Sequence, residues 1–211
     1  MKTQQLKIPG THLAEYLIKE GRDNKLYLLL HGYAESGTHL FNNLVDLLPG
    51  DATILAPNGP YPIPKKNQDH WSLNFAWYFY DNVSGKYFID YKIPALYIKN
   101  LLQALGLEET PVTLIGYSQG GYLAPFAALE LQQVEKVVGL CCSYKHEMLP
   151  QKLPFPIYGL HGEDDLLVDP QNASNCHQQL ILKGNEGQFQ LIPNQGHRLT
   201  PQFLKHLKQY L

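Results

Sequence analysis

Short runs of consecutive apolar residues alternate along the chain with longer segments in which apolar residues recur every three or four positions. Consecutive apolar residues are typical of strands buried on both faces, and they predict a mostly parallel sheet. The expected strands are 25–30, 53–56, 112–115, 134–142, 155–160 and 188–192. The three- and four-residue spacing predicts helices over 37–48, 93–105, 120–132, 172–183 and 201–211. Together these elements predict an α/β protein with helices on both faces of the sheet.

The segment 57–91 breaks this alternation. It is rich in aromatic residues, and long loops inside a compact domain are uncommon unless they are functional. We expect an irregular but packed excursion with two open interpretations. It either walls an apolar substrate pocket or closes one end of the core. In the first case the candidate substrate-binding residues are Trp71, Phe75, Trp77 and Tyr78.

Composition and charge narrow the class of protein. The 211 residues carry a net charge of −2 without a basic stripe, which argues against a nucleic-acid partner. Length and composition predict a single domain over 1–211. The N-terminal residues lack the apolar core of a signal peptide, and no run is long enough for stable membrane insertion. We therefore expect a cytoplasmic protein.

The three cysteines do not indicate a metal or a disulfide framework. Cys141 and Cys142 are adjacent, and adjacent cysteines rarely chelate one ion together. Cys176 stands alone in a predicted helix. We interpret all three as small buried residues, and we expect neither a metal nor another cofactor.

The sequence Gly116-Tyr117-Ser118-Gln119-Gly120 matches the pattern G-x-S-x-G between a predicted strand and a predicted helix. In this pattern the serine lies in a sharp, strained turn, and glycine two residues to either side relieves the steric clash. The turn presents the hydroxyl at the end of the strand. Ser118 is thus the candidate nucleophile, and the alternative is a serine that only caps the helix.

A serine nucleophile needs a base and an acid that orients the base, in the chain order serine, acid, histidine. His177 and His206 fall inside predicted helices, whereas His197 follows the last strand and precedes the final helix. His197 is therefore the candidate general base. Position alone does not choose among the acids that follow the strand 155–160, which are Glu163, Asp164, Asp165 and Asp169.

An oxyanion hole requires two backbone donors near the nucleophile. One is expected from the residue after it, Gln119, and the other from the turn after an early strand. The sequence Leu30-His31-Gly32-Tyr33-Ala34 provides that turn, with Tyr33 as the donor. His31 precedes Ser118 in the chain, and we interpret it as a turn-stabilising residue.

The stretches LHGYAESG, GYSQGG, HGEDDLLV and QGH resemble the carboxylesterase and phospholipase branch of the α/β-hydrolase superfamily, which includes acyl-protein thioesterases. The resemblance implies an α/β-hydrolase fold without a separate lid domain or a cofactor. It also implies Ser118 as nucleophile, His197 as base, and Tyr33 and Gln119 as oxyanion donors. The acid of that family is the last residue of H-G-x-x-D, which falls on Asp165.

The chain departs from the same branch in the early turn. The branch usually shows H-G-x-G-D there, and this chain has Ala34 and Glu35 at the last two positions. The departure predicts a different closure of this loop over the substrate.

Our main functional hypothesis is a serine hydrolase that cleaves esters or thioesters of short to medium acyl chains. The lack of a positive cluster favours neutral esters or thioesters, and the sequence does not distinguish a small-molecule ester from an acylated protein. Alternatives are a peptidase or lactone hydrolase on the same framework, and a non-catalytic binding protein. A homodimer through the ring-rich segment is also left open.

Overall fold

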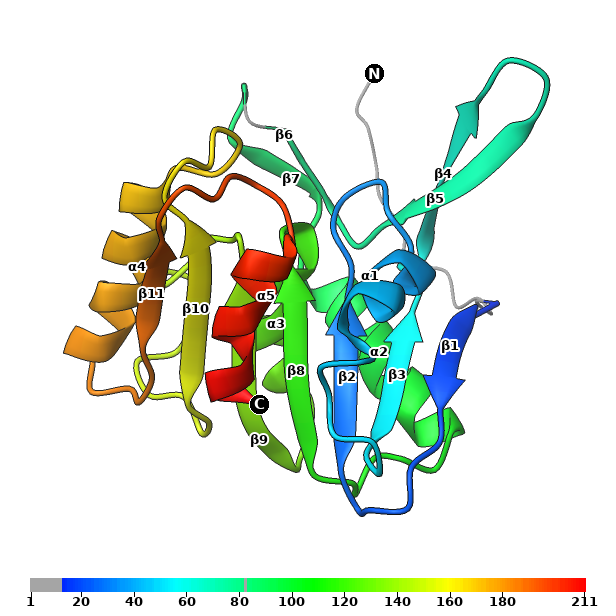
Figure 1. The fold of residues 1–211 in the computed structure, drawn as a ribbon, viewed down its shortest axis with the longest axis horizontal. Helices are drawn as coiled ribbons and strands as arrows, with labels where there is room; N and C mark the ends of the chain where they lie inside the picture. The colour runs from blue at the N-terminus through cyan, green and yellow to red at the C-terminus, as the bar shows by residue number, and fades with distance from the viewer. Residues whose placement is uncertain (1–12, 82) are drawn as a thin grey trace, which may run out of the picture.

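The computed structural model describes residues 13–81 and 83–211. Within them, seven strands form one sheet in the order β1-β3-β2-β8-β9-β10-β11 (Figure 1). All neighbouring strands of this sheet are parallel except β1, which pairs antiparallel with β3. The bounds are β1 Tyr16–Lys19, β2 Leu26–Leu30, β3 Thr53–Pro57, β8 Val112–Tyr117, β9 Val134–Leu140, β10 Ile157–Gly162 and β11 Phe189–Ile192. The predicted parallel sheet is therefore confirmed.

Alternating side chains of the central strands build two hydrophobic cores, one on each face of the sheet. In β2, Leu26, Leu28 and Leu30 face one core, whereas Tyr27 and Leu29 face the other. Because both faces are buried, helices must cover both. Residues of α2 (Lys92–Ala104), α3 (Gln119–Ala128) and α4 (Pro170–Leu182) join the first core, and those of α1 (Gly37–Leu44) and α5 (Pro201–Leu207) join the second.

The crossover connections bring the carboxyl ends of the parallel strands to one edge of the sheet, at the top of Figure 1. The candidate residues follow β2, β8, β10 and β11 at this edge. The arrangement thus gathers the candidate chemistry at one end of the molecule.

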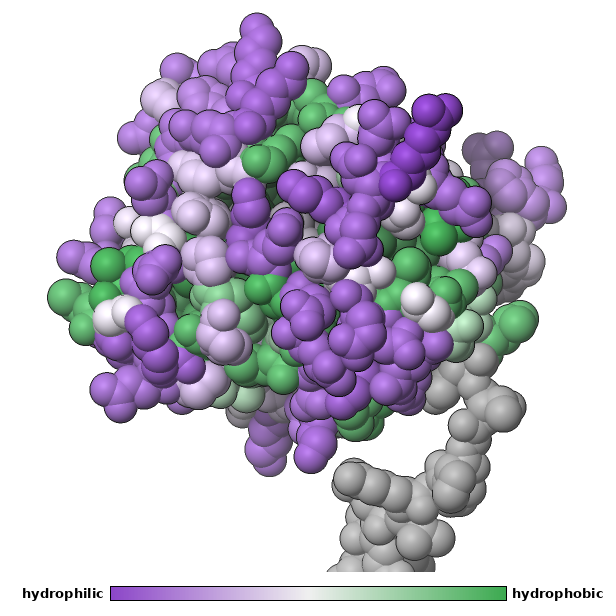
Figure 2. Space-filling model, turned by 90° about the horizontal axis from the view of Figure 1, so that it is seen from below, coloured by the Kyte–Doolittle hydropathy of each residue, from purple (hydrophilic) through white to green (hydrophobic). Residues whose placement is uncertain are grey.

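The view from below shows a surface of mainly hydrophilic side chains with smaller apolar areas between them (Figure 2).

The expectation of an irregular excursion over 57–91 was wrong. The segment forms two antiparallel hairpins, β4 (Tyr61–Lys66) with β5 (Trp71–Ala76) and β6 (Phe79–Asp81) with β7 (Lys86–Ile89). Two prolines in β4 obscured the strand pattern, since proline is tolerated only where the strand needs no ladder donor, as in such an isolated pair. The β4–β5 hairpin projects from the body at the upper right of Figure 1.

Other differences concern the ends of elements. The edge strand β1 was missed because it is short and mostly exposed, so that its sequence lacks a buried apolar run. α1 ends at Leu44 and α3 at Ala128, each four residues before the predicted end. The last predicted helix ends at Leu207 and continues as a 3₁₀ turn over Lys208–Tyr210.

Candidate active site

Ser118 lies in a strained turn between β8 and α3. Its backbone has φ 48° and ψ −115°, a conformation that residues with a side chain rarely adopt. The flanking glycines permit the turn: a Cβ on Gly116 would lie 2.3 Å from the Gly120 carbonyl oxygen, and one on Gly120 would lie 2.0 Å from that of Leu30. The structure therefore supplies the steric reason for both glycines of the pattern.

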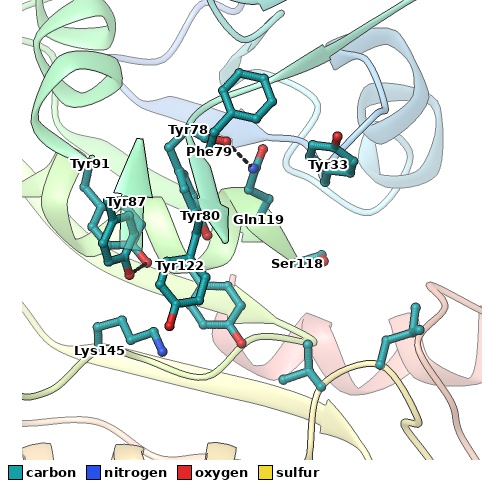
Figure 3. A pocket seen from close by; sticks show the side chains of 12 residues that line it. Tyr33, Tyr78, Phe79, Tyr80, Tyr87, Tyr91, Ser118, Gln119, Tyr122 and Lys145 are labelled. Carbon is teal, nitrogen blue, oxygen red and sulfur yellow. Dashed lines mark hydrogen bonds between the residues drawn. The ribbon is translucent and has the colours of Figure 1, made fainter. Parts of the chain in front are cut away.

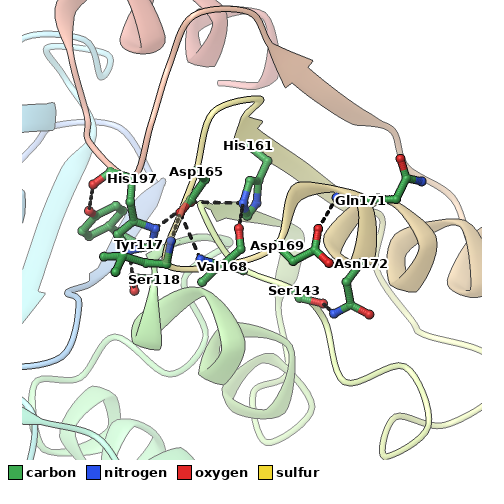
Figure 4. A network of polar contacts seen from close by, with 11 residues as sticks. Tyr117, Ser118, Ser143, His161, Asp165, Val168, Asp169, Gln171, Asn172 and His197 are labelled. Atoms are coloured by element: carbon green, nitrogen blue, oxygen red, sulfur yellow. Dashed lines mark hydrogen bonds and ion pairs between the residues drawn. The ribbon is translucent and has the colours of Figure 1, made fainter.

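The structure brings Ser118, His197 and Asp165 together in one hydrogen-bonded chain (Figure 4). His197 Nε2 lies 3.0 Å from Ser118 Oγ, and His197 Nδ1 lies 2.7 Å from Asp165 Oδ2. The carboxylate accepts a hydrogen bond from Nδ1–H. Nε2 then carries no proton and can accept the proton of the serine hydroxyl. This is the geometry in which an imidazole can act as a base toward a hydroxyl.

The loop 163–169 between β10 and α4, here called the acid loop, explains why Asp165 and not its acidic neighbours contacts His197. The Asp165 side chain is fully buried, and its Oδ1 accepts hydrogen bonds from the N–H groups of Leu167 at 2.8 Å and Val168 at 3.0 Å. Glu163 and Asp164 are exposed. Asp169 caps α4 by accepting from the Gln171 N–H at 2.9 Å. Of the four acids left open by position, only Asp165 contacts His197.

A second histidine contacts the same carboxylate oxygen. His161 Nε2 lies 3.1 Å from Asp165 Oδ2 and 3.0 Å from the Val168 carbonyl oxygen. Since both neighbours are acceptors, Nε2 carries the proton and donates to them. Desolvation lowers the pKa of His161, so the ring stays neutral. The sequence analysis singled out only His197 as a partner of the acid, and nothing local in the sequence indicated that His161 contacts Asp165.

The two predicted oxyanion donors lie in the turn after β2, which contains Tyr33, and at the first residue of α3, which is Gln119. Within the described part of the chain, neither the Tyr33 N–H nor the Gln119 N–H donates a hydrogen bond. Ala34 has φ 56°, at the position where the related branch has glycine. The Glu35 carboxylate accepts from the Gly32 N–H at 3.0 Å and holds the turn closed. Both departures from the family pattern thus fit a tight turn.

His31 stabilises this turn from below. It is fully buried, and its Nε2 accepts from the Gly59 N–H at 2.9 Å, so Nδ1 carries the proton and donates to the Gly32 carbonyl oxygen at 2.7 Å. Burial lowers the pKa of His31 to about 4. A neutral ring with both nitrogens bonded to backbone has a structural role, as expected from its place in the chain.

A pocket of about 420 Å³ opens above Ser118 and Gln119 (Figure 3). The β6–β7 hairpin and its flanks form much of its wall, and the acid loop forms part of its rim. Six of its twelve lining residues are tyrosines. Its lining residues are Tyr33, Tyr78, Phe79, Tyr80, Tyr87, Tyr91, Ser118, Gln119, Tyr122, Lys145, Leu167 and Val168.

Of the four proposed substrate-binding rings, only Tyr78 lines this pocket. Trp77 is fully buried and donates from Nε1 to the His31 carbonyl oxygen at 2.9 Å, which makes it part of the core. Phe75 lies in a different groove beside Tyr97, and Trp71 is 67% exposed on the projecting hairpin. The segment 57–91 therefore contributes residues both to this pocket and, through Trp77 and Tyr78, to the first core.

Sequence reasoning missed the lysine and most of the tyrosines of the pocket. Lys145 lies in the loop after β9, at the edge of the sheet where the candidate residues gather. His197 was identified by its position just past a parallel strand. The same rule, applied to β9, would have drawn attention to this loop. One lysine is not a positive cluster, but it gives this pocket one cationic side chain.

One group of potential metal ligands occurs among the described residues, formed by Cys141, Asp165 and His197. Asp165 and His197 are already bonded to each other. Burial raises the pKa of the Cys141 thiol to about 12, so the thiolate that a metal requires is disfavoured. We assign no ion to this group. Cys142 is also buried, whereas Cys176 is partly exposed.

The sheet order and the strand–serine–helix turn define the α/β-hydrolase class. The chain belongs to the phospholipase/carboxylesterase family, whose model matches residues 14–211. It is therefore a hydrolytic enzyme of the phospholipase/carboxylesterase type.

Solved structures show the same fold at low sequence identity. Esterase PE8 has a TM-score of 0.74 at 19% identity, covering 93% of this chain and 97% of that chain. Acyl-protein thioesterase 2 of Zea mays has a TM-score of 0.72 at 18% identity, covering 95% and 97%. A carboxylesterase from Mesorhizobium loti has a TM-score of 0.68 at 18% identity, covering 90% and 89%.

A search of curated protein sequences finds no significant relative. Among the helices of residues 13–81 and 83–211, none is both long and apolar enough to cross a membrane.

Proposed function

We propose that the enzyme cleaves carboxylic esters or thioesters of short to medium acyl chains through an acyl-enzyme, with Ser118 as nucleophile. The observation that carries the proposal is the chain of two hydrogen bonds from Asp165 through His197 to Ser118. A serine hydroxyl is a weak nucleophile alone, and this arrangement gives it both a base and an orienting acid.

In the first half of the reaction, His197 Nε2 takes the Ser118 proton while Oγ attacks the substrate carbonyl carbon. The N–H groups of Tyr33 and Gln119 stabilise the negative charge on the carbonyl oxygen. Asp165 stabilises the imidazolium and stays ionised. His197 then protonates the leaving alcohol or thiol, and the acyl group remains on Ser118.

In the second half, water takes the place of the leaving group. His197 removes a proton from the water, and the resulting hydroxide attacks the acyl carbon to form a second tetrahedral intermediate. The same two N–H groups stabilise it, and His197 returns the proton to Ser118 Oγ as the acid product leaves. The proton transfers between Ser118 and His197 use groups that already lie within hydrogen-bond distance of each other.

The pocket supports the proposed range of acyl chains. Its volume of about 420 Å³ lies toward the lower end of ligand pockets, which favours small substrates over long acyl chains. Gln119 fixes the inner wall, because its Oε1 accepts from the Trp77 N–H at 2.9 Å and its Nε2 donates to the Tyr78 carbonyl oxygen at 2.8 Å. We therefore expect p-nitrophenyl esters to show a maximum of kcat/KM at an intermediate chain length.

The decisive test is intact-mass labelling with a fluorophosphonate on wild type, Ser118→Ala and His197→Ala. We expect one adduct on wild type, none on Ser118→Ala, and much slower labelling of His197→Ala. Ser143→Ala is the matched control for the loss of a serine, and we expect it to be labelled like the wild type. Ser143 is a buried serine after β9, and its hydroxyl accepts a hydrogen bond from the Asn172 side chain. Labelling of Ser118→Ala at the wild-type rate would refute the assignment.

A further inference from the structure

A single ammonium group lies in the wall of the candidate pocket. Among the described residues that line it, Lys145 is the only charged one. No carboxylate of the described residues forms an ion pair with its Nζ atom. An unpaired cation in a site lined by neutral side chains leaves the pocket electropositive.

Two tyrosine rings hold the ammonium group. Lys145 Nζ lies 5.9 Å from the centroid of the Tyr80 ring and 5.7 Å from that of Tyr122, within the range of cation–π contacts. The aromatic position that could bind a cationic substrate is therefore already occupied. Burial raises the pKa of the Tyr78 and Tyr122 hydroxyls, so these phenols stay neutral and do not compensate the lysine.

The backbone around Lys145 is fixed on both sides. The Ser143 hydroxyl accepts from Asn172 Nδ2 at 3.2 Å, and the Tyr144 hydroxyl donates to the Tyr158 carbonyl oxygen at 2.7 Å. On the other side, Lys183 Nζ donates to the His146 carbonyl oxygen. A loop held in this way presents its cation with little further loss of conformational entropy on binding.

Figure 3 shows Lys145 and Ser118 at different sides of the same pocket, with the Tyr122 ring beside Lys145. A substrate whose carbonyl group lies at Ser118 can therefore extend along the tyrosines toward the ammonium group. Resting on the proposed function, we propose that the pocket selects esters that carry a carboxylate group several bonds from the scissile carbonyl, and that Lys145 binds this carboxylate.

One ammonium group suits a carboxylate better than a phosphate. A phosphate monoester carries nearly two negative charges at neutral pH, and the described lining offers no second cation to meet them. The neutral tyrosine hydroxyls can donate further hydrogen bonds to a carboxylate oxygen. Lys145 is thus a specificity-determining residue, separate from the groups that carry out the chemistry.

The test compares charged and neutral esters of the same shape. In the first arm, mono-p-nitrophenyl adipate, whose carboxylate lies in the acyl part, is compared with its methyl-capped diester. In the second arm, 4-butanoyloxybenzoate, whose carboxylate lies in the leaving group, is compared with its methyl ester. The measured quantity is the ratio of kcat/KM for the charged and the capped ester.

We expect Lys145→Met to lower this ratio about tenfold in one arm, and Lys145→Arg to retain most of it, because the charge remains. The arm that responds identifies the part of the substrate that carries the carboxylate. Lys205→Met removes one exposed lysine from α5 and controls for net charge. If Lys145→Met leaves the ratio of kcat/KM for the charged and the capped ester unchanged in both arms, the proposal is refuted.

Binding without turnover separates this inference from the proposed function. Calorimetric titration of monomethyl adipate and of 4-butanoyloxybenzoate into Ser118→Ala, with and without Lys145→Met, measures carboxylate recognition alone in both arms. We expect about tenfold weaker binding of one of these ligands after Lys145→Met, and equal binding of both ligands by the two proteins would refute recognition by Lys145. If the wild type is neither labelled nor active on any ester, the proposed function fails while the titration still decides the role of Lys145.

Discussion

The replacement Asp165→Asn is a sharp test of the candidate triad, because the structure fixes which way the new amide must point. Oδ1 of Asp165 accepts from two backbone N–H groups, those of Leu167 and Val168. The amide oxygen of asparagine must take this position, since an NH₂ group there would face two donors. The NH₂ group then points at His197 Nδ1 and His161 Nε2.

The expected magnitude follows from the tautomer of His197. Facing an NH₂ group, Nδ1 must give up its proton and accept, which places the proton on Nε2. In that tautomer Nε2 cannot accept the Ser118 proton. The equivalent change in a serine protease triad lowers kcat about 10⁴-fold, and we expect a similar loss here, equal to about 5 kcal/mol of transition-state stabilisation.

The assay is steady-state hydrolysis of p-nitrophenyl butyrate at pH 7.5, with folding checked by circular dichroism. Asp164→Asn is the matched control, since it makes the same change at the adjacent exposed residue. We expect the control to retain wild-type kcat. If a folded Asp165→Asn protein keeps kcat within tenfold of wild type, the assignment of Asp165 as the orienting acid is refuted.

Two further predictions concern stability. Gly120→Ala should lower the free energy of unfolding by about 3 kcal/mol, because its Cβ would lie 2.0 Å from the Leu30 carbonyl oxygen. Urea denaturation measures this loss. The control Gly50→Ala should show no such loss, because its Cβ meets nothing within 4 Å. Burial lowers the pKa of His31 from 6.5 to about 4, so its neutral ring contributes about 3 kcal/mol to the free energy of unfolding that is lost as the pH falls through that window. The free energies of unfolding measured at pH 7.5 and pH 4.5 should therefore differ less in His31→Gln than in the wild type.

The sequence predicted the fold and part of the site because both depend on local patterns. Consecutive apolar residues identify buried strands, and the positions of Ser118 and His197 just past such strands follow from the parallel topology. Asp165 could not be chosen over Asp164 or Glu163 by position, because the choice depends on which side chain the loop turns inward. Only the resemblance to a known family selected it.

The pocket could not be predicted at the level of single residues. Trp77 and Tyr78 are adjacent, yet Trp77 packs beneath the turn of His31 and Tyr78 lines the pocket. Which of two neighbouring rings points inward depends on the path and register of the hairpins, and the prolines of β4 obscured these hairpins in the sequence. Lys145 was missed because a position just past a parallel strand was used only to identify the nucleophile, the base and the acid.

The candidate base comes late in the chain, and this has a consequence for biosynthesis. His197 lies 79 residues after Ser118, in the connection between β11 and α5. The hydroxyl therefore has no base until the last strand has joined the sheet. A nascent or C-terminally truncated chain should be inert, and hydrolytic activity should appear only when the final elements have docked. Recovery of activity during refolding is then a direct readout of completed folding.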